Sequence, residues 1–248
     1  MGVIIYFIGG RNMYQYIYAT AVIVGLIVTV SFLILRVMRG GVAAMFLKAG
    51  ASVCFIGTAF SAFAYNHENF EYGILVVMGL IFGLLGDVWL DMKYVYKQHN
   101  HIYTYAGIIC FIVNHIFYIP AVAFKYGEGD FKWWYGVINI VACVVFASVT
   151  LALEKPMGVK YGRYKKILFL YGMLLSLTMF TAINGIFFRG FSKDFLMLSI
   201  AAVLFTLSDL VLSNIYFKEG GNTKTNVVIN HLLYYAAQFT FASTLLLK

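Results

Sequence analysis

The sequence predicts an all-α protein, a polytopic membrane bundle of eight transmembrane helices. Composition is the first reason: 62% of the residues are hydrophobic, 11% are charged, and the mean hydropathy is +0.85. A soluble protein of 248 residues does not have this composition, whereas a protein with many membrane spans does. The second reason is that apolar stretches of about 20 residues, enough to cross a bilayer, recur along the whole chain.

Eight stretches have this length, and short polar loops separate them. They cover residues 15–37, 42–64, 73–91, 103–124, 134–153, 167–188, 195–217 and 227–247. Each span must be helical, because a helix closes its own backbone hydrogen bonds in a medium without water. We expect a single membrane domain over residues 1–248, since no low-complexity segment divides the chain. No cleavable signal peptide is recognised, so we expect the first span to direct insertion.

Basic residues predict the orientation. Eleven lie at the loops after odd-numbered spans, against six at the even-numbered loops and the two termini. Cytoplasmic loops carry the excess of lysine and arginine, so we expect the odd-numbered loops in the cytoplasm and both termini outside. A bacterial plasma membrane and an endoplasmic-reticulum membrane both suit these spans. The net charge of +8 is explained by topology and by contact with membrane lipids, so we expect no nucleic-acid partner.

Polar side chains in the first four spans are the first candidates for a site. Lys48 lies early in the second span, where it either reaches the headgroups or pairs with an aspartate. Asp87 lies late in the third span, and a carboxylate inside the membrane is so costly that it predicts a function. Asp91, next to the loop, is interpreted as a helix-end carboxylate. His115 is near the middle of the fourth span, where Tyr118 can hydrogen-bond it, in either a structural or an active-site role.

The last three spans add a second group of polar candidates. Asn184 in the sixth span is interpreted as a contact between helices. Asp209 follows Ser208 in the seventh span and precedes about two further turns of apolar helix, so an interpretation as a helix-end group fits it poorly. Polar residues also follow one stripe of the eighth span, and they are expected to position a carboxylate or a lipid headgroup: Tyr234, Tyr235 and Gln238.

The two aspartates have matching contexts. Each follows a small residue late in a span that runs inward, so both are expected at similar depth in the cytoplasmic half of the bilayer. Asn114-His115 and Asn230-His231 follow them in the next spans. These matches predict a parallel 4+4 repeat, although the offsets of 122 and 116 residues differ and chance similarity of apolar segments is the alternative. Two facing carboxylates would divide into one protonated and one ionised group.

The sequence lacks the residues that several common hydrolytic mechanisms require. The sequence has no GxSxG nucleophile motif and no HExxH motif, and its membrane region does not offer three histidines for zinc. The three cysteines lie inside spans without CxxC spacing and are interpreted as core residues. We therefore expect no metal and no cofactor, and a chemistry based on two carboxylates.

At these positions the sequence resembles the YhhN-type lysoplasmalogenase family of integral membrane vinyl-ether hydrolases. The resemblance covers about residues 48–240. One departure is that family members commonly have a proline directly after the lysine of the second span, where this chain has Ala49. The residues that carry the resemblance are Leu84-Leu85-Gly86-Asp87-Val88-Trp89-Leu90, Gly107, Asn114-His115-Ile116-Phe117-Tyr118, Leu207-Ser208-Asp209-Leu210 and Tyr234-Tyr235-Ala236-Ala237-Gln238.

The resemblance implies hydrolysis of lysoplasmalogens to a fatty aldehyde and a glycerophospho-base. A neutral carboxylic acid would deliver a proton to carbon, and an ionised one would stabilise the oxocarbenium ion and activate water. Asp87 and Asp209 would take these roles in an order that the sequence leaves open. His115, Tyr235 and Gln238 would orient water or the lysophospholipid headgroup, and Lys48 is a candidate phosphate contact.

Two other classes of function remain open. A proton-coupled transporter also combines repeated halves with intramembrane carboxylates, although this chain lacks proline-broken spans. A purely structural membrane protein would leave Asp209 unexplained. The sequence does not indicate an oligomeric state.

Overall fold

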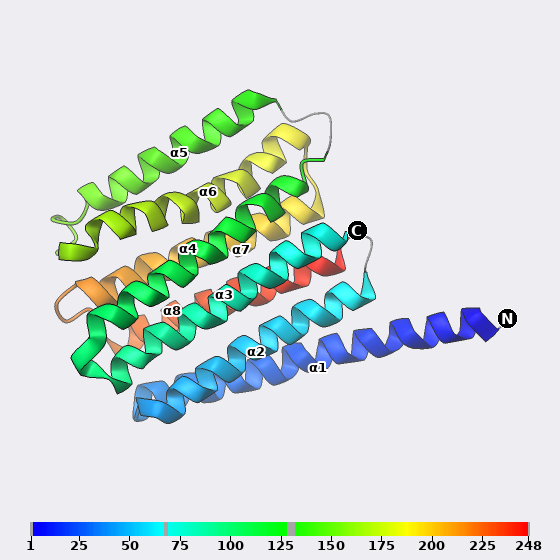
Figure 1. Ribbon diagram of the computed structural model, residues 1–248, viewed down its shortest axis with the longest axis horizontal. Coiled ribbons are helices and arrows are strands. Elements are labelled where there is room, and N and C mark those ends of the chain that lie inside the picture. The colour runs from blue at the N-terminus through cyan, green and yellow to red at the C-terminus, as the bar shows by residue number, and fades with distance from the viewer. Residues whose placement is uncertain (1, 67–68, 128–131, 248) are drawn as a thin grey trace.

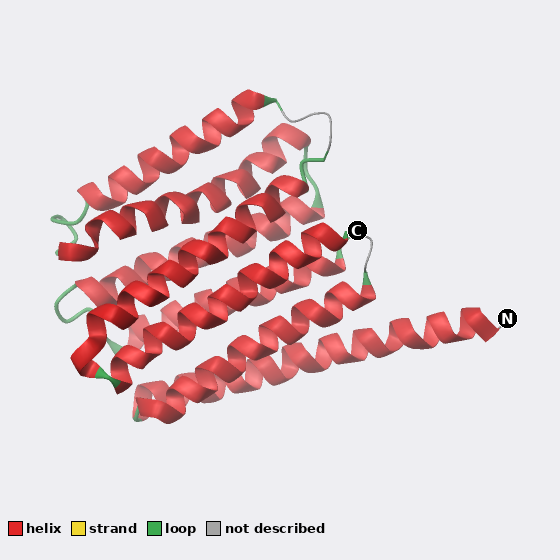
Figure 2. Cartoon of the chain, in the orientation of Figure 1, coloured by secondary structure: helices red, strands yellow, loops and turns green. Residues whose placement is uncertain are grey.

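The chain is helical almost throughout the described part of the computed structural model, which covers residues 2–66, 69–127 and 132–247 and gives only the backbone of residues 2–12. Short loops join the helices (Figure 2). The helices are α1 (Gly2–Met38), α2 (Gly41–Tyr65), α3 (Phe70–Val95), α4 (Asn100–Phe124), α5 (Trp133–Ala152), α6 (Lys165–Arg189), α7 (Lys193–Phe217) and α8 (Lys224–Ser243). Three short 3-10 turns adjoin them, η1 (Lys97–His99), η2 (Gly162–Tyr164) and η3 (Thr244–Leu246). The all-α class is thus confirmed.

Seven of these helices, α1 to α7, are long and apolar enough to cross a membrane. Large apolar side chains on the outside of the bundle, such as Ile27, Ile109 and Val141, are at least half exposed, as in a protein that faces lipid. The chain is therefore an integral membrane protein. Of the eight transmembrane helices expected from the sequence, α8 is the one not among these seven, because its many polar residues lower its hydropathy.

The polar residues of α8 explain this difference. Asn230, His231, Tyr234, Tyr235 and Gln238 are all buried, and α8 packs against α7, α2, α1 and α3. Protein rather than lipid surrounds the polar face, so α8 can carry hydrogen-bonding groups that a lipid-facing helix cannot.

Helices that follow one another in the chain pack side by side, except α4 and α5, and α5 lies at one edge of the bundle with α1 at the other (Figure 1). Two further contacts close the bundle, α4 against α6 and α8 against α2. In a 4+4 repeat α4 corresponds to α8 and α6 to α2, so these two contacts between the halves would be equivalent. The repeat itself stays a prediction.

The asparagine–histidine pairs do not occupy equivalent places in the two halves. Asn114 donates to the backbone oxygen of Gly79, eight residues before Asp87. Asn230 donates to the backbone oxygen of Ser208, the residue directly before Asp209. The unequal offsets in the sequence therefore correspond to a real shift of about two helical turns.

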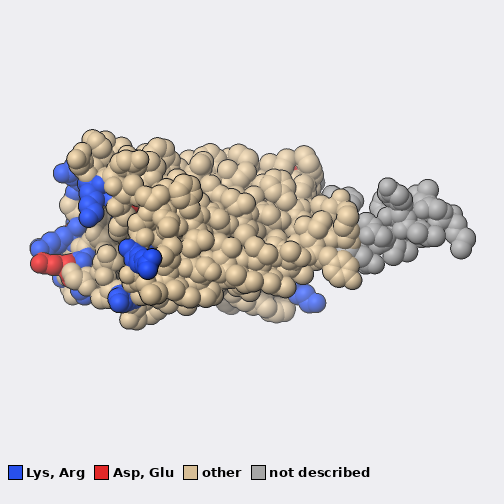
Figure 3. All heavy atoms as spheres, turned by 90° about the horizontal axis from the view of Figure 1, so that it is seen from below, with Lys and Arg blue, Asp and Glu red and all other residues tan. Residues whose placement is uncertain are grey.

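The loops after α1, α3, α5 and α7 lie at the same end of the bundle (Figure 1). Lysine and arginine side chains gather at this end, called the basic end below, while most of the flank is free of charge (Figure 3). Arg11 and Lys248, which belong to the charge count, have side chains outside the described residues. Asp87 and Asp209 are each eight residues from the last residue of their helices, Val95 and Phe217, so both lie nearer the basic end.

Candidate active site

A row of alternating charges runs from the basic end into the bundle. Arg36 of α1 donates to Asp91 of α3. Lys48 of α2 lies with its Nζ 3.3 Å from Asp91 Oδ1 and 3.1 Å from Asp87 Oδ1. Asp87 and Asp91 are one helical turn apart on the same face of α3, which lets a single lysine reach both. Two cations and two carboxylates balance, as the burial of charge requires.

These contacts resolve two questions that the sequence left open. Lys48 is 4% exposed and pairs with carboxylates, so it does not extend to the headgroups. Asp91 is 2% exposed and paired, and its interpretation as a helix-end group at the loop was wrong. The reason is that α1 and α2 cover this face of α3, which the sequence of α3 does not reveal.

The second oxygen of the Asp87 carboxylate accepts two hydrogen bonds from hydroxyl groups. Ser52 Oγ donates to Oδ2 at 2.7 Å and Tyr234 OH donates to it at 2.8 Å. With the Lys48 ammonium on its other oxygen, both oxygens of the Asp87 carboxylate have charged or hydroxyl partners.

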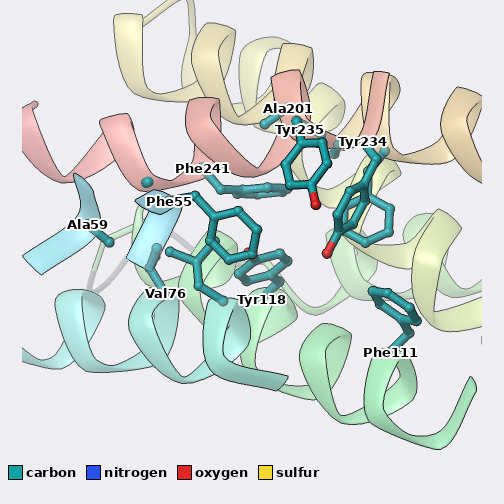
Figure 4. Packing of buried hydrophobic residues seen from close by; sticks show 14 of the residues in the cluster. Phe55, Ala59, Val76, Phe111, Tyr118, Ala201, Tyr234, Tyr235 and Phe241 are labelled. Carbon is teal, nitrogen blue, oxygen red and sulfur yellow. The ribbon is translucent and has the colours of Figure 1, made fainter. Parts of the chain in front are cut away.

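Further hydrogen bonds fix Tyr234 itself. Gln238, one turn later on α8, donates through Nε2 to the Tyr234 hydroxyl at 3.1 Å. Tyr118 of α4 donates to Gln238 Oε1 at 2.7 Å. Figure 4 shows Tyr234 and Tyr235 projecting from α8 toward Phe111 and Tyr118. Tyr235 donates to the backbone oxygen of Lys48 at 3.0 Å, so it positions α2 and does not touch the carboxylate.

Glycines on α3 make room for this network. A Cβ atom on Gly83 would lie 2.6 Å from Gln238 Nε2, and one on Gly79 would collide with the Tyr118 ring. Small residues let helices approach closely in membranes. Here they let α8 and α4 bring their polar groups against the backbone of α3.

Asp209 has different surroundings. Tyr171 of α6 donates to its carboxyl group. No cation pairs with Asp209 among the described residues. The carboxyl group lines a cavity of about 100 Å³ whose other walls are mostly apolar, with Phe111, Leu168 and Leu175 among them.

Aromatic rings separate the two carboxylates. The Tyr234 ring packs edge-on against Phe111, with centroids 6.0 Å apart, and against Phe205 at 5.5 Å. Phe111 in turn lies 6.5 Å from the Tyr171 ring. No hydrogen bond joins Asp87 to Asp209 in the part of the chain that the structure describes. The two carboxyl groups therefore have separate hydrogen-bond partners.

His115 lies between the two networks. Its ring centroid is 6.1 Å from that of Tyr118 and 5.8 Å from that of Tyr171. Its Nδ1 is 3.0 Å from the Thr178 hydroxyl, and its Nε2 has no hydrogen-bond partner among the described residues. His115 thus contacts both sides of the site while its second nitrogen remains available.

Two predicted site residues point elsewhere. The Ser208 hydroxyl accepts from Asn230 at 3.1 Å, which joins α7 to α8 away from the Asp209 cavity. Asn184 donates to Asn139 at 2.5 Å and joins α6 to α5, as its interpretation as a contact between helices proposed.

Sequence reasoning missed Ser52 and Tyr171 as partners of the aspartates. Ser52 is one turn after Lys48, on the same face of α2, so it could have been found once that lysine was taken as a carboxylate partner. Tyr171 is one of 19 tyrosines and carries no local signal. Only the packing of α6 against α7 selects it.

A model of the YhhN family matches residues 43–245. The chain belongs to the YhhN family. The match includes both aspartates and their partners from α2, α6 and α8, whereas Arg36 and the rest of α1 lie before it. No curated protein and no solved structure matches the chain. Membership of the YhhN family is consistent with the hydrolase expected from the sequence motifs.

Proposed function

We propose that this YhhN-family protein is an intramembrane hydrolase that cleaves the vinyl-ether bond of lysoplasmalogens, giving a fatty aldehyde and a glycerophospho-base. The observation that carries the proposal is the contrast between two aspartates at similar depth. Asp87 has a buried cation as partner, whereas Asp209 has a tyrosine and faces an apolar cavity. Acid and base roles are commonly divided between two carboxyl groups in this way.

Asp209 is the proton donor in this mechanism. An unpaired carboxylate beside an apolar cavity carries the full penalty of a buried charge, and a proton removes that penalty. The cavity lining suits the alkenyl chain of the lipid. Asp209 delivers its proton to the alkenyl carbon that is β to the ether oxygen, and the double-bond electrons form the new C–H bond. The positive charge is then shared between the α-carbon and the ether oxygen.

Asp87 stabilises that oxocarbenium ion. The Asp87 carboxylate is held by Lys48 and by the hydroxyl groups of Ser52 and Tyr234. The Tyr234 ring also packs against Phe111, which lines the cavity, so this aromatic layer lies between Asp87 and the lipid. Water adds to the α-carbon and returns a proton to the Asp209 carboxylate. The hemiacetal hydroxyl then loses its proton and forms the aldehyde carbonyl, the bond between the α-carbon and the glycerol oxygen breaks, and the glycerol oxygen takes up a proton. His115 and Gln238 orient the groups around the water.

The test uses purified protein with a lysoplasmalogen and with the matching ester lysolipid. We expect aldehyde from the vinyl ether and little fatty acid from the ester, and we expect Asp87→Asn and Asp209→Asn to abolish the aldehyde. Asp194→Asn is the matched control, since Asp194 lies on α7 near its start and pairs with Lys125. If folded Asp209→Asn protein kept full activity, the mechanism would be wrong.

The second candidate is a proton-coupled transporter. It is favoured by the two contacts between the halves of the bundle, α4 with α6 and α8 with α2. Equivalent contacts of this kind are expected in carriers, whose two halves are related by pseudo-symmetry. Solute flux into proteoliposomes without lipid turnover would support the carrier and exclude the hydrolase.

Orientation belongs to the same proposal. We infer that the basic end faces the cytoplasm and that both termini lie outside, by the excess of lysine and arginine. The carboxylates then lie in the cytoplasmic half of a bacterial plasma membrane or endoplasmic-reticulum membrane. Labelling of single cysteines placed in the α5–α6 loop and in the α6–α7 loop, from each side of the membrane, tests this orientation.

A further inference from the structure

A second cavity, of about 370 Å³, opens at the basic end beside the row of charges. Four segments form it: the end of α1 with the turn into α2, the end of α3 with the turn η1, the end of α7, and the start of α8. Its charged lining contains one acid, Asp91, which already pairs with two cations. The basic side chains in the lining are Arg36, Arg39, Lys97 and Lys224.

Contacts on several sides fix the Arg36 side chain, and one of its N–H groups has no acceptor. Its side chain is 10% exposed, and its guanidinium lies 5.3 Å from the Phe32 ring centroid and 5.0 Å from that of Tyr94. One terminal nitrogen donates to Asp91, but Nε is buried and has no hydrogen-bond partner among the described residues. A buried N–H without an acceptor is unfavourable, and because Arg36 lines the cavity, an anion there would bring acceptor oxygens beside its guanidinium group.

The start of α8 adds a second feature that favours an anion. Asn222, Thr223 and Lys224 line the cavity, and α8 begins at Lys224. The first turn of a helix presents backbone N–H groups and a partial positive charge, which together bind phosphate and similar anions. None of Arg39, Lys97 and Lys224 forms an ion pair within the described residues, so no carboxylate in that part of the chain neutralises their charges.

We propose that this basic cavity binds a phosphate group, and that the phosphate is the one in the headgroup of the lysophospholipid substrate. The identity of the lipid rests on the proposed hydrolase. Lys48, the phosphate contact expected from the sequence, lines neither cavity and is taken up by two carboxylates. Arg36 and its neighbours replace it in this role.

The position of the cavity relative to Asp209 supports the headgroup as the source. Leu212 and Tyr216 of α7 line both the basic cavity and the apolar cavity, so a single layer of side chains separates them. Leu212 is three residues after Asp209, which corresponds to about 4.5 Å along the helix. A glycerol unit of a few covalent bonds spans such a distance. A lipid with its phosphate among the basic residues would place its vinyl ether beside Asp209.

Equilibrium binding to the full chain in nanodiscs tests this site. The probes are a saturated-ether lysophospholipid, which cannot be hydrolysed at a vinyl ether, and the same alkylglycerol without phosphate. Combined replacement of Arg39→Gln, Lys97→Gln and Lys224→Gln is expected to weaken binding of the phospholipid about tenfold or more and to leave the alkylglycerol unchanged. These three side chains are exposed, so the variant is expected to fold.

The matched control is Lys160→Gln with Arg163→Gln, which removes two cations from a neighbouring cavity at the same end of the bundle. An equal loss of binding in this control, or an equal loss for both lipids, would overturn the site.

Inorganic phosphate serves as a third probe. Competition between phosphate and the phospholipid identifies the headgroup, whereas phosphate binding that the lipid does not displace would overturn that assignment. Because no bond is cleaved, this result is independent of aldehyde formation, so failure of the site and failure of the hydrolase are distinguishable.

Discussion

The Lys48 ammonium lies 3.1 Å from the Asp87 carboxylate, inside a bundle where the corresponding partner of Asp209 is a tyrosine. Lys48 precedes Asp87 by 39 residues and Tyr171 precedes Asp209 by 38, so helices α2 and α6 supply the two partners from similar places. One half of the bundle thus stabilises a charge that the other half does not. This asymmetry is the basis of the roles assigned to the two aspartates.

Loss of the proton donor is the first prediction. Asp209→Asn is expected to reduce aldehyde formation about 10²- to 10⁴-fold, because an amide cannot deliver the proton. Tyr171→Phe removes only a hydrogen bond to that donor and is expected to cost about tenfold. Initial rates of aldehyde release measure both. A larger loss in Tyr171→Phe than in Asp209→Asn would contradict the assignment of Asp209 as the acid.

Loss of the buried cation is the second prediction. Lys48→Met leaves two carboxylates with only Arg36, and removal of one partner of a buried ion pair costs about 3–5 kcal/mol. Thermal unfolding in detergent, followed by intrinsic fluorescence, measures the effect. The double variant Lys48→Met with Asp91→Asn restores charge balance and is expected to recover much of the lost stability. Simple additivity of the two single effects would show that the charges are not coupled.

Close packing at Gly83 gives the third prediction. Gly83→Ala places a Cβ atom 2.6 Å from Gln238 Nε2 and is expected to displace Gln238 from Tyr234, lowering both activity and thermal stability. Gly57→Ala is the control, because Gly57 is also inside a helix but has open space around its Cβ position. It is expected to be neutral or stabilising, since alanine favours helix. Equal effects in the two variants would exclude a packing role for Gly83.

Hydrogen bonding by Tyr118 gives the fourth prediction. Tyr118→Phe leaves Gln238 Oε1 buried without its donor, which is expected to destabilise the fold by about 1–3 kcal/mol. Chemical or thermal unfolding measures the loss. Tyr65→Phe removes a hydroxyl that accepts from Gln15 at the surface and serves as the control with little expected effect. Unchanged stability in Tyr118→Phe would show that Gln238 finds another partner.

The loop between α5 and α6 gives a prediction on pH. Lys165 Nζ donates to Glu154 at 2.7 Å, the backbone N–H of Tyr161 donates to it at 3.0 Å, and these contacts lower the pKa of Glu154. A lowered pKa means that the contacts stabilise the fold above the unfolded-state pKa of about 4.3 and lose that effect as the pH falls through the folded-state pKa. Glu154→Gln is therefore expected to lower Tm at about pH 7 but not at about pH 3. If Glu154→Gln lowered Tm by the same amount at both values of pH, titration of Glu154 would not explain the effect.

Several features followed from the sequence because their signals are local. Apolar stretches of helix length gave the number of helices, and the excess of basic residues in alternate loops matches the basic end of the bundle. Asp87 and Asp209 stood out because an ionisable group within an apolar helix is costly wherever the helix packs. The polar stripe of α8 also followed, because residues one turn apart share a face.

The partners of those groups could not be predicted, because they depend on which helices meet. Tyr171 is one tyrosine among many until α6 packs against α7, and Asp91 looks like a loop residue until α1 and α2 cover it. The sequence by itself determined the helices, most of their boundaries to within a few residues and the two costly carboxylates, since each depends on residues close together in the chain. The start of α1 is the exception, because α1 begins at Gly2 and not near the predicted position 15. The tertiary structure alone decided that Asp87 pairs with Lys48, that Asp209 faces an apolar cavity and that four distant segments enclose a basic one. Charge compensation acts through space, and only the packing of the helices sets those distances.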